Sequence, residues 1–78
     1  MALSVEVLAG IKLQLEARAG FLGGQAAELR LDAQMPGLPE ESAEMRIRAA
    51  VWSDVEAAKV RGLIASVEEE MGREKADT

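Results

Sequence analysis

Apolar and polar residues alternate with a period of two in three segments of the chain, 11–19, 27–35 and 43–51. In each segment the odd-numbered residues are apolar and most even-numbered residues are polar. A period of two is typical of β-strands, because successive side chains of a strand point to opposite faces of the sheet. A single apolar face also suits an antiparallel sheet. The pattern therefore predicts a three-stranded antiparallel meander, with strands at about 3–19, 26–35 and 43–52.

The strongest helix signal follows the third segment and runs from Ser53 to Lys75. Ser53 and Glu56 have the spacing of a capping box, in which two side chains satisfy free backbone N–H groups at a helix start. Apolar residues then recur at spacings of three and four, as on one side of an amphipathic helix: Ala57, Val60, Ile64, Val67 and Met71. We expect one C-terminal amphipathic helix at about 53–74, packed on the odd-numbered face of the sheet, in a single α+β domain spanning 1–78.

Two stretches rich in glycine or proline separate the predicted strands. Residues 20–24 contain three glycines, which supply the positive φ angles of a hairpin loop, and residues 36–39 contain two prolines and a glycine. Residues 3–10 fit either the start of the first strand or a short helix that ends at Gly10. A helical alternative exists for the wider chain as well, since it is rich in Ala, Glu, Leu and Arg, which form helices well. Three alternations separated by turn signals favour the strands.

The chain has 78 residues, with no Cys and no His. A monomer of this size buries only about 60% of its unfolded surface and is marginally stable. Disulfides are impossible, and zinc and haem lack their usual ligands, so we expect no metal and no cofactor. Partner subunits are the remaining source of stability for so small a domain, which predicts a homo-oligomer.

The formal net charge is -5, and both signs are spread along the chain without a basic cluster. This disfavours nucleic-acid binding, which requires grouped Lys and Arg. No apolar run is long enough to span a membrane, and the N-terminus has no basic region ahead of an apolar one. We therefore expect no membrane span, no signal peptide and a cytoplasmic location.

No residue stands out as catalytic. The chain lacks Cys, His and Tyr, so Ser-His-Asp and Cys-His arrangements are excluded. The acidic runs at 40–41 and 68–70 fit solvated surfaces better than acid–base sites, and the glycines at 20–24 lack the Lys-Ser/Thr of a phosphate loop.

Three apolar residues fall outside the predicted core and are candidate interface residues. Phe21 and Leu22 would lie at the tip of the first hairpin, where there is little core to join. Trp52 is even-numbered and would project from the polar face, and Trp is enriched in interface hot spots. Trp52 fits equally well as a cover over the junction of sheet and helix.

The order of features over residues 10–72 resembles the C-terminal half of OsmC/Ohr-type proteins. The resemblance is carried by Gly10-Ile11-Lys12-Leu13 opening a strand, Met45-Arg46-Ile47-Arg48 as a later strand, and Ser53-Asp54 opening a helix. Family members with peroxidase activity use cysteine thiols, and here Met71-Gly72 stands near the place of the helical cysteine. The resemblance thus implies a similar shape or dimerisation habit, without peroxide chemistry.

These observations favour a small non-enzymatic oligomeric module that binds another protein. One alternative is a subunit of a small-molecule-binding or enzymatic assembly, with a site between subunits that Arg46, Arg48 or a pair of Glu residues would line. Another is an acidic inhibitor or antitoxin-like protein that masks a basic surface.

Overall fold

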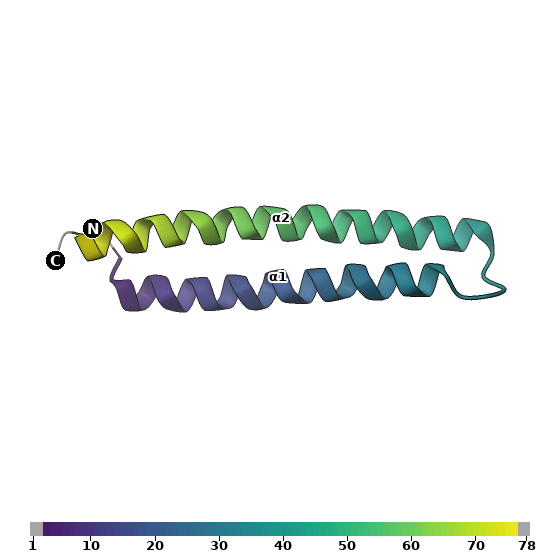
Figure 1. Cartoon of the computed structure of the whole chain (residues 1–78), viewed down its shortest axis with the longest axis horizontal. Helices are drawn as coiled ribbons and strands as arrows, with labels where there is room; N and C mark the ends of the chain where they lie inside the picture. Colours follow the sequence, from purple (N-terminus) through teal and green to yellow (C-terminus); the bar gives the residue numbers. More distant parts are fainter. Residues whose placement is uncertain (1–2, 77–78) are drawn as a thin grey trace.

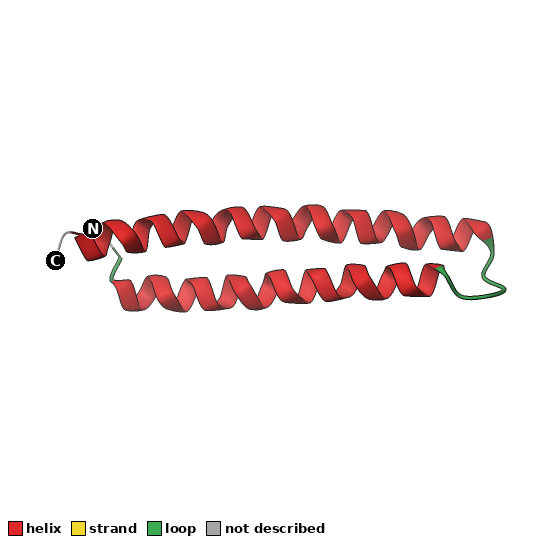
Figure 2. Cartoon of the chain, in the orientation of Figure 1, coloured by secondary structure: helices red, strands yellow, loops and turns green. Residues whose placement is uncertain are grey.

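The computed structural model describes residues 3–76 and shows two long helices that form an antiparallel hairpin (Figures 1 and 2). Helix α1 spans Val5–Ala33 and helix α2 spans Glu40–Ala76. The molecule is a rod with extents of 60 × 16 × 14 Å. No residue in the described part of the chain is in a strand, so the predicted α+β meander is wrong. Of its three strands, the first two fall mainly in α1 and the third lies in α2.

The period-two pattern has a helical explanation. Residues two apart on a helix point about 200° apart, which is nearly to opposite sides. Leu15 is half-buried against α2, whereas Leu13 is 70% exposed. An alternation of apolar residues thus marks a helix with two apolar sides, of which one packs in the hairpin and the other faces outward.

On the side of each helix that faces the other, the contacting positions recur every seven residues. We call these positions the seam. On α1 the seam consists of Val5, Leu8, Lys12, Leu15, Ala19, Leu22, Ala26, Leu29 and Ala33. On α2 it consists of Ala43, Arg46, Ala50, Ser53, Ala57, Val60, Ile64, Val67, Met71 and Glu74. Every one of these residues is buried or half-buried. Alternate steps of three and four are the pattern of a coiled coil, which keeps one stripe against the partner helix along its whole length.

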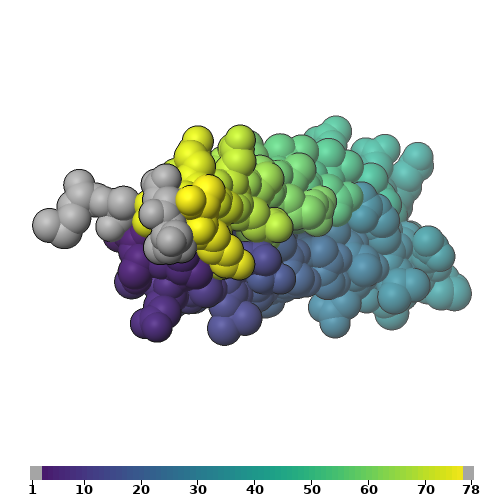
Figure 3. Space-filling model, turned by 60° about the vertical axis from the view of Figure 1, so that its left-hand side comes forward, coloured from purple at the N-terminus to yellow at the C-terminus, as the bar shows by residue number. Residues whose placement is uncertain are grey.

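On α2 the seam residues are mostly small from Ala43 to Ala57 and mostly large from Val60 to Glu74. Leu8 and Leu22 are the large apolar residues of the described chain that are buried, and Ala26, Ala50 and Ala57 are buried with them. Small side chains let two helix axes approach closely. In the space-filling view the side chains of the two helices meet along the face in view (Figure 3).

Polar side-chain pairs among the described residues join the two helices and fix their register. Arg30 donates to and pairs with the carboxylate of Asp54, and Lys12 Nζ lies 3.8 Å from Glu68 Oε2. The Ser53 hydroxyl donates to Gln25 Oε1 over 3.3 Å. This register places Leu22 opposite Ala57.

The helix ends lie elsewhere than the sequence indicated. Ser4 is the cap of α1, and its hydroxyl accepts a hydrogen bond from the Val7 N–H at 3.2 Å. The predicted cap, Ser53, lies inside α2 and is 1% exposed, so the capping box is wrong. The predicted C-terminal helix forms the later part of α2, which begins at Glu40.

One of the two predicted turns exists. The chain reverses between α1 and α2 at residues 34–39, where Gly37 has a φ of 82° that favours glycine. The predicted hairpin loop at 20–24 is wrong, because these residues continue α1. Residues 5–10 are also helical, and the helix does not end at Gly10.

Candidate functional site

The three candidate interface residues lie inside the helices, away from their ends. Phe21 on α1 is 62% exposed and Trp52 on α2 is 57% exposed. Leu22 is 1% exposed, so it belongs to the seam and offers no outer surface. Phe21 and Leu22 do not form a loop tip. They point to different sides of one helix, and only Phe21 is accessible to another molecule.

The side of α1 that faces away from α2 carries a second repeat of apolar and small residues, which we call the outer face of α1. Its members are Gly10, Leu13, Ala17, Gly20, Gly24, Ala27 and Leu31. They follow the same alternate steps of three and four as the seam, and all are exposed. Leu13 and Leu31, near its two ends, are 70% and 67% exposed. A water-exposed helix side is normally polar, so this face has the composition of a packing surface.

Three glycines lie on this face at a cost to the helix. Each glycine inside a helix is about 1 kcal/mol less favourable than alanine. A Cβ built on Gly10, Gly20 or Gly24 would meet no other atom within 4 Å. Packing within the hairpin therefore gives no reason for glycine at these positions.

Gly20 and Gly24 leave a shallow hollow on the outer face of α1. It has a volume of about 370 Å³ and is lined by Gly20, Phe21, Gly24, Gln25 and Glu28. The Phe21 ring borders this hollow, and the Arg18 guanidinium lies 6.0 Å from the ring centroid. A depression and a projecting aromatic side chain are thus neighbours on one helix.

Helix α2 has exposed apolar residues of its own. Ile47, Val51 and Val55 follow each other at steps of four and are about half exposed. Met45 and Trp52 are seven residues apart and lie one above the other on a further strip of the same helix. Apolar surface therefore exists on both helices, on sides that the hairpin does not use.

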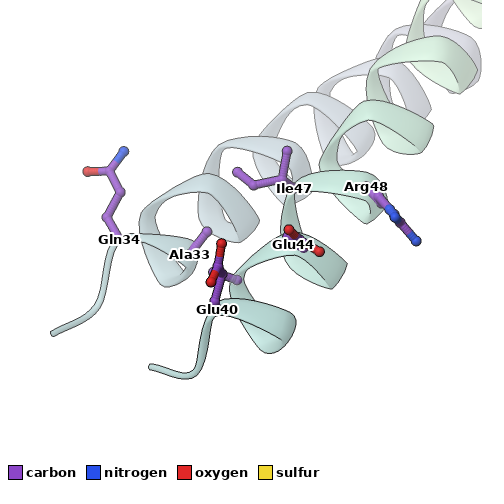
Figure 4. A pocket seen from close by; sticks show the side chains of 7 residues that line it. Ala33, Gln34, Glu40, Glu44, Ile47 and Arg48 are labelled. Carbon is purple, nitrogen blue, oxygen red and sulfur yellow. The ribbon is translucent and has the colours of Figure 1, made fainter. Parts of the chain in front are cut away.

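A second hollow lies at the loop end of the hairpin (Figure 4). It has a volume of about 360 Å³ and is lined by Ala33, Gln34, Glu40, Ala43, Glu44, Ile47 and Arg48. Gln34 and Arg48 extend away from each other at its two sides, and Ala33 and Ile47 lie between them. Arg48 points away from Glu40, so the hollow offers apolar contact and no paired charges.

The acidic and polar side chains of residues 3–76 give no sign of a bound ion or ligand. These residues contain no group of acidic side chains placed to hold a metal ion. Every buried polar side-chain atom among them has a hydrogen-bond partner, so no orphaned group is aimed at a ligand. Neither helix in this part of the chain has a stretch apolar enough to cross a bilayer.

Comparison of the chain with protein-family models, curated proteins and solved structures found no match. The two strands that carried the resemblance to OsmC/Ohr-type proteins are helical here. The feature of the structure that points to a function is therefore the exposed apolar surface of the hairpin.

Proposed function

We propose that this chain is a non-enzymatic assembly module that binds other proteins through the exposed apolar faces of its helices. The observation that carries the proposal is an imbalance in where large apolar side chains lie. Among the described residues twelve large apolar side chains are exposed, nine are half-buried, and Leu8 and Leu22 are buried, so the exposed ones form the largest group. Large exposed apolar surface on a soluble chain typically marks an interaction site.

The geometry of the hairpin explains why a partner is needed. A two-helix rod has a single line of contact, so each helix can cover only one side of the other. Sequence positions on the remaining sides could have been polar at no cost to the seam. The large apolar residues there include one Trp and one Phe, which contribute strongly to protein interfaces.

The two alternatives have less support. The loop-end hollow contains Arg48 and the pair Glu40 and Glu44, but Arg48 points away from Glu40. Acidic residues are partly neutralised by ion pairs such as Arg30 with Asp54 and Arg73 with Glu70. A surface that masks a basic partner would keep its carboxylates available.

Site-specific photo-crosslinking tests the proposal. A benzoylphenylalanine is introduced at position 52 or at position 51, and the purified chain is irradiated in lysate of its source cells. We expect discrete covalent adducts from both positions. The matched control places the same group at Glu69, which is exposed on α2, carries a charge and lies roughly five helical turns from both positions. The proposal is wrong if positions 51 and 52 give no more adduct than position 69, whether with this chain or with any other protein.

A further inference from the structure

The residues on the outer face of α1 form a palindrome: their order is the same in both directions along the helix. From Leu13 to Leu31 its residues are Leu, Ala, Gly, Gly, Ala and Leu, at steps of four, three, four, three and four. A two-fold interface places residue i of one copy against residue j of the other and j against i, so it requires such a self-complementary surface. Resting on the proposed function, we propose that the partner on this face is a second copy of the chain, with the two α1 helices antiparallel.

The palindrome sets the register of this dimer. Leu13 lies opposite Leu31 of the second copy, and Ala17 lies opposite Ala27. At the centre Gly20 lies opposite Gly24 of the second copy. The two helices therefore approach most closely at the two-fold axis, where neither has a side chain on this face. This contact gives the glycines a role that packing within the hairpin does not.

Phe21 and the hollow beside it complete the central contact. In this register the Phe21 rings of the two copies are neighbours at the two-fold axis. Each ring can extend over Gly20 and Gly24 of the other copy, into the hollow of about 370 Å³. A side chain of one helix inserted into a space on the facing helix is the packing mode of coiled coils. Each copy supplies both a projecting Phe21 ring and the hollow that receives the ring of the other copy.

Charge selects the antiparallel arrangement over the parallel one. Glu16 and Arg30 flank the same side of the outer face of α1. In the antiparallel register Glu16 of each copy lies beside Arg30 of the other, which makes two ion pairs. A parallel register would place Glu16 beside Phe21 and leave Arg30 without this partner. Arg30 already binds Asp54 within the hairpin, and its five N–H donors suffice for a second carboxylate.

The contact area predicts a weak, reversible dimer. The overlapping part of α1 is roughly 34 Å long, and a strip roughly 10 Å wide buries about 350 Å² per copy. The total of about 700 Å² is at the low end of specific interfaces, below the usual 1,200 Å² or so. We expect a dissociation constant on the order of tens of micromolar.

Sedimentation velocity of the purified full chain tests the interface, from about 5 to about 500 µM so as to bracket this constant. We expect wild type to dimerise reversibly and Gly24→Gln to weaken the dimer about tenfold or more. Glutamine is a better helix former than glycine, so the helix signal in circular dichroism should not fall. Gly62→Gln is the matched control, because Gly62 is an exposed helical glycine on α2. A wild-type chain that stays monomeric, or a Gly24→Gln dimer as strong as the Gly62→Gln dimer, overturns the inference.

Disulfide trapping tests the orientation, since the chain has no cysteine of its own. Leu13→Cys mixed with Leu31→Cys should give a linked dimer faster than either variant alone. Equally fast linkage of Leu13→Cys to itself would instead indicate a parallel dimer and overturn the antiparallel arrangement. None of these failures affects the photo-crosslinks from positions 51 and 52 to other proteins, which test the proposed function separately.

Discussion

The hydroxyl of Ser53 on α2 donates a hydrogen bond to the amide oxygen of Gln25 on α1, over 3.3 Å. Ser53 is the fully buried polar residue of the described chain, and Gln25 is exposed. The pair therefore joins the seam to the surface. Water can replace the Ser53 hydroxyl as the hydrogen-bond donor to Gln25, because the Gln25 side chain is in contact with solvent.

This arrangement predicts opposite outcomes for two substitutions of Ser53. Ser53→Ala should change the free energy of unfolding by less than about 0.5 kcal/mol, since alanine fits a seam already rich in alanine and forms helices better. Ser53→Leu should destabilise the hairpin by about 1–3 kcal/mol, because the close contact beside Ala50 and Ala57 has no room for it. Urea unfolding followed by circular dichroism measures both. Equal effects would mean that the seam is loosely packed.

Leu22 and Leu13 provide a matched test of the two sides of α1. Leu22→Ala should destabilise the hairpin by about 2–5 kcal/mol, because it removes a buried side chain from the seam. Leu13→Ala removes the same atoms from an exposed position and should cost less than about 0.5 kcal/mol in the monomer. The measurement is urea unfolding at a concentration low enough to exclude the dimer. A larger effect at Leu13 than at Leu22 would contradict the observed seam.

The comparison of Leu13 with Leu15 also explains why the sequence suggested strands. Both positions are apolar because α1 has two apolar sides, and a helix places residues two apart on nearly opposite sides. Period two over nine residues cannot separate such a helix from a strand. The longer repeat can, because Leu8, Leu15, Leu22 and Leu29 recur every seven residues, a spacing typical of a coiled coil.

Some other features of the fold could be predicted from the sequence. The apolar stripe from Ala57 to Met71 is helical and lies in the seam, as its spacing of three and four indicates. The turn at 36–39 follows from its prolines and Gly37. The glycines at 20–24 misled the prediction, because glycine marks a turn in most chains and here continues a helix. The composition of a short segment does not show whether its glycines belong to a turn or to a helix surface that another molecule contacts.

Arg30 and Asp54 form an ion pair between the helices with both side chains partly exposed. A double-mutant cycle with Arg30→Ala and Asp54→Ala should give a coupling energy of about 0.2–1 kcal/mol, the range of pairs exposed to water. Raising the salt concentration should reduce the coupling, because exposed charges are screened. The pair Lys59 and Glu56 lies within α2 and is the control for ion pairs that do not join the helices. A coupling energy that does not change with salt would show that Arg30 and Asp54 are less exposed to water than the structure indicates.

Gly37 and Gly62 should respond in opposite directions to alanine. Gly37 has a φ of 82° in the loop, a conformation that costs alanine about 1–2 kcal/mol, so Gly37→Ala should destabilise the hairpin by about that amount. Gly62 is helical and a Cβ there meets no atom within 4 Å, so Gly62→Ala should stabilise the hairpin by about 1 kcal/mol. Thermal and urea unfolding of the two variants measure both changes against wild type. Stabilisation by Gly37→Ala would show that the loop between α1 and α2 has a different backbone conformation, and destabilisation by Gly62→Ala would show that α2 is packed against another surface at that position.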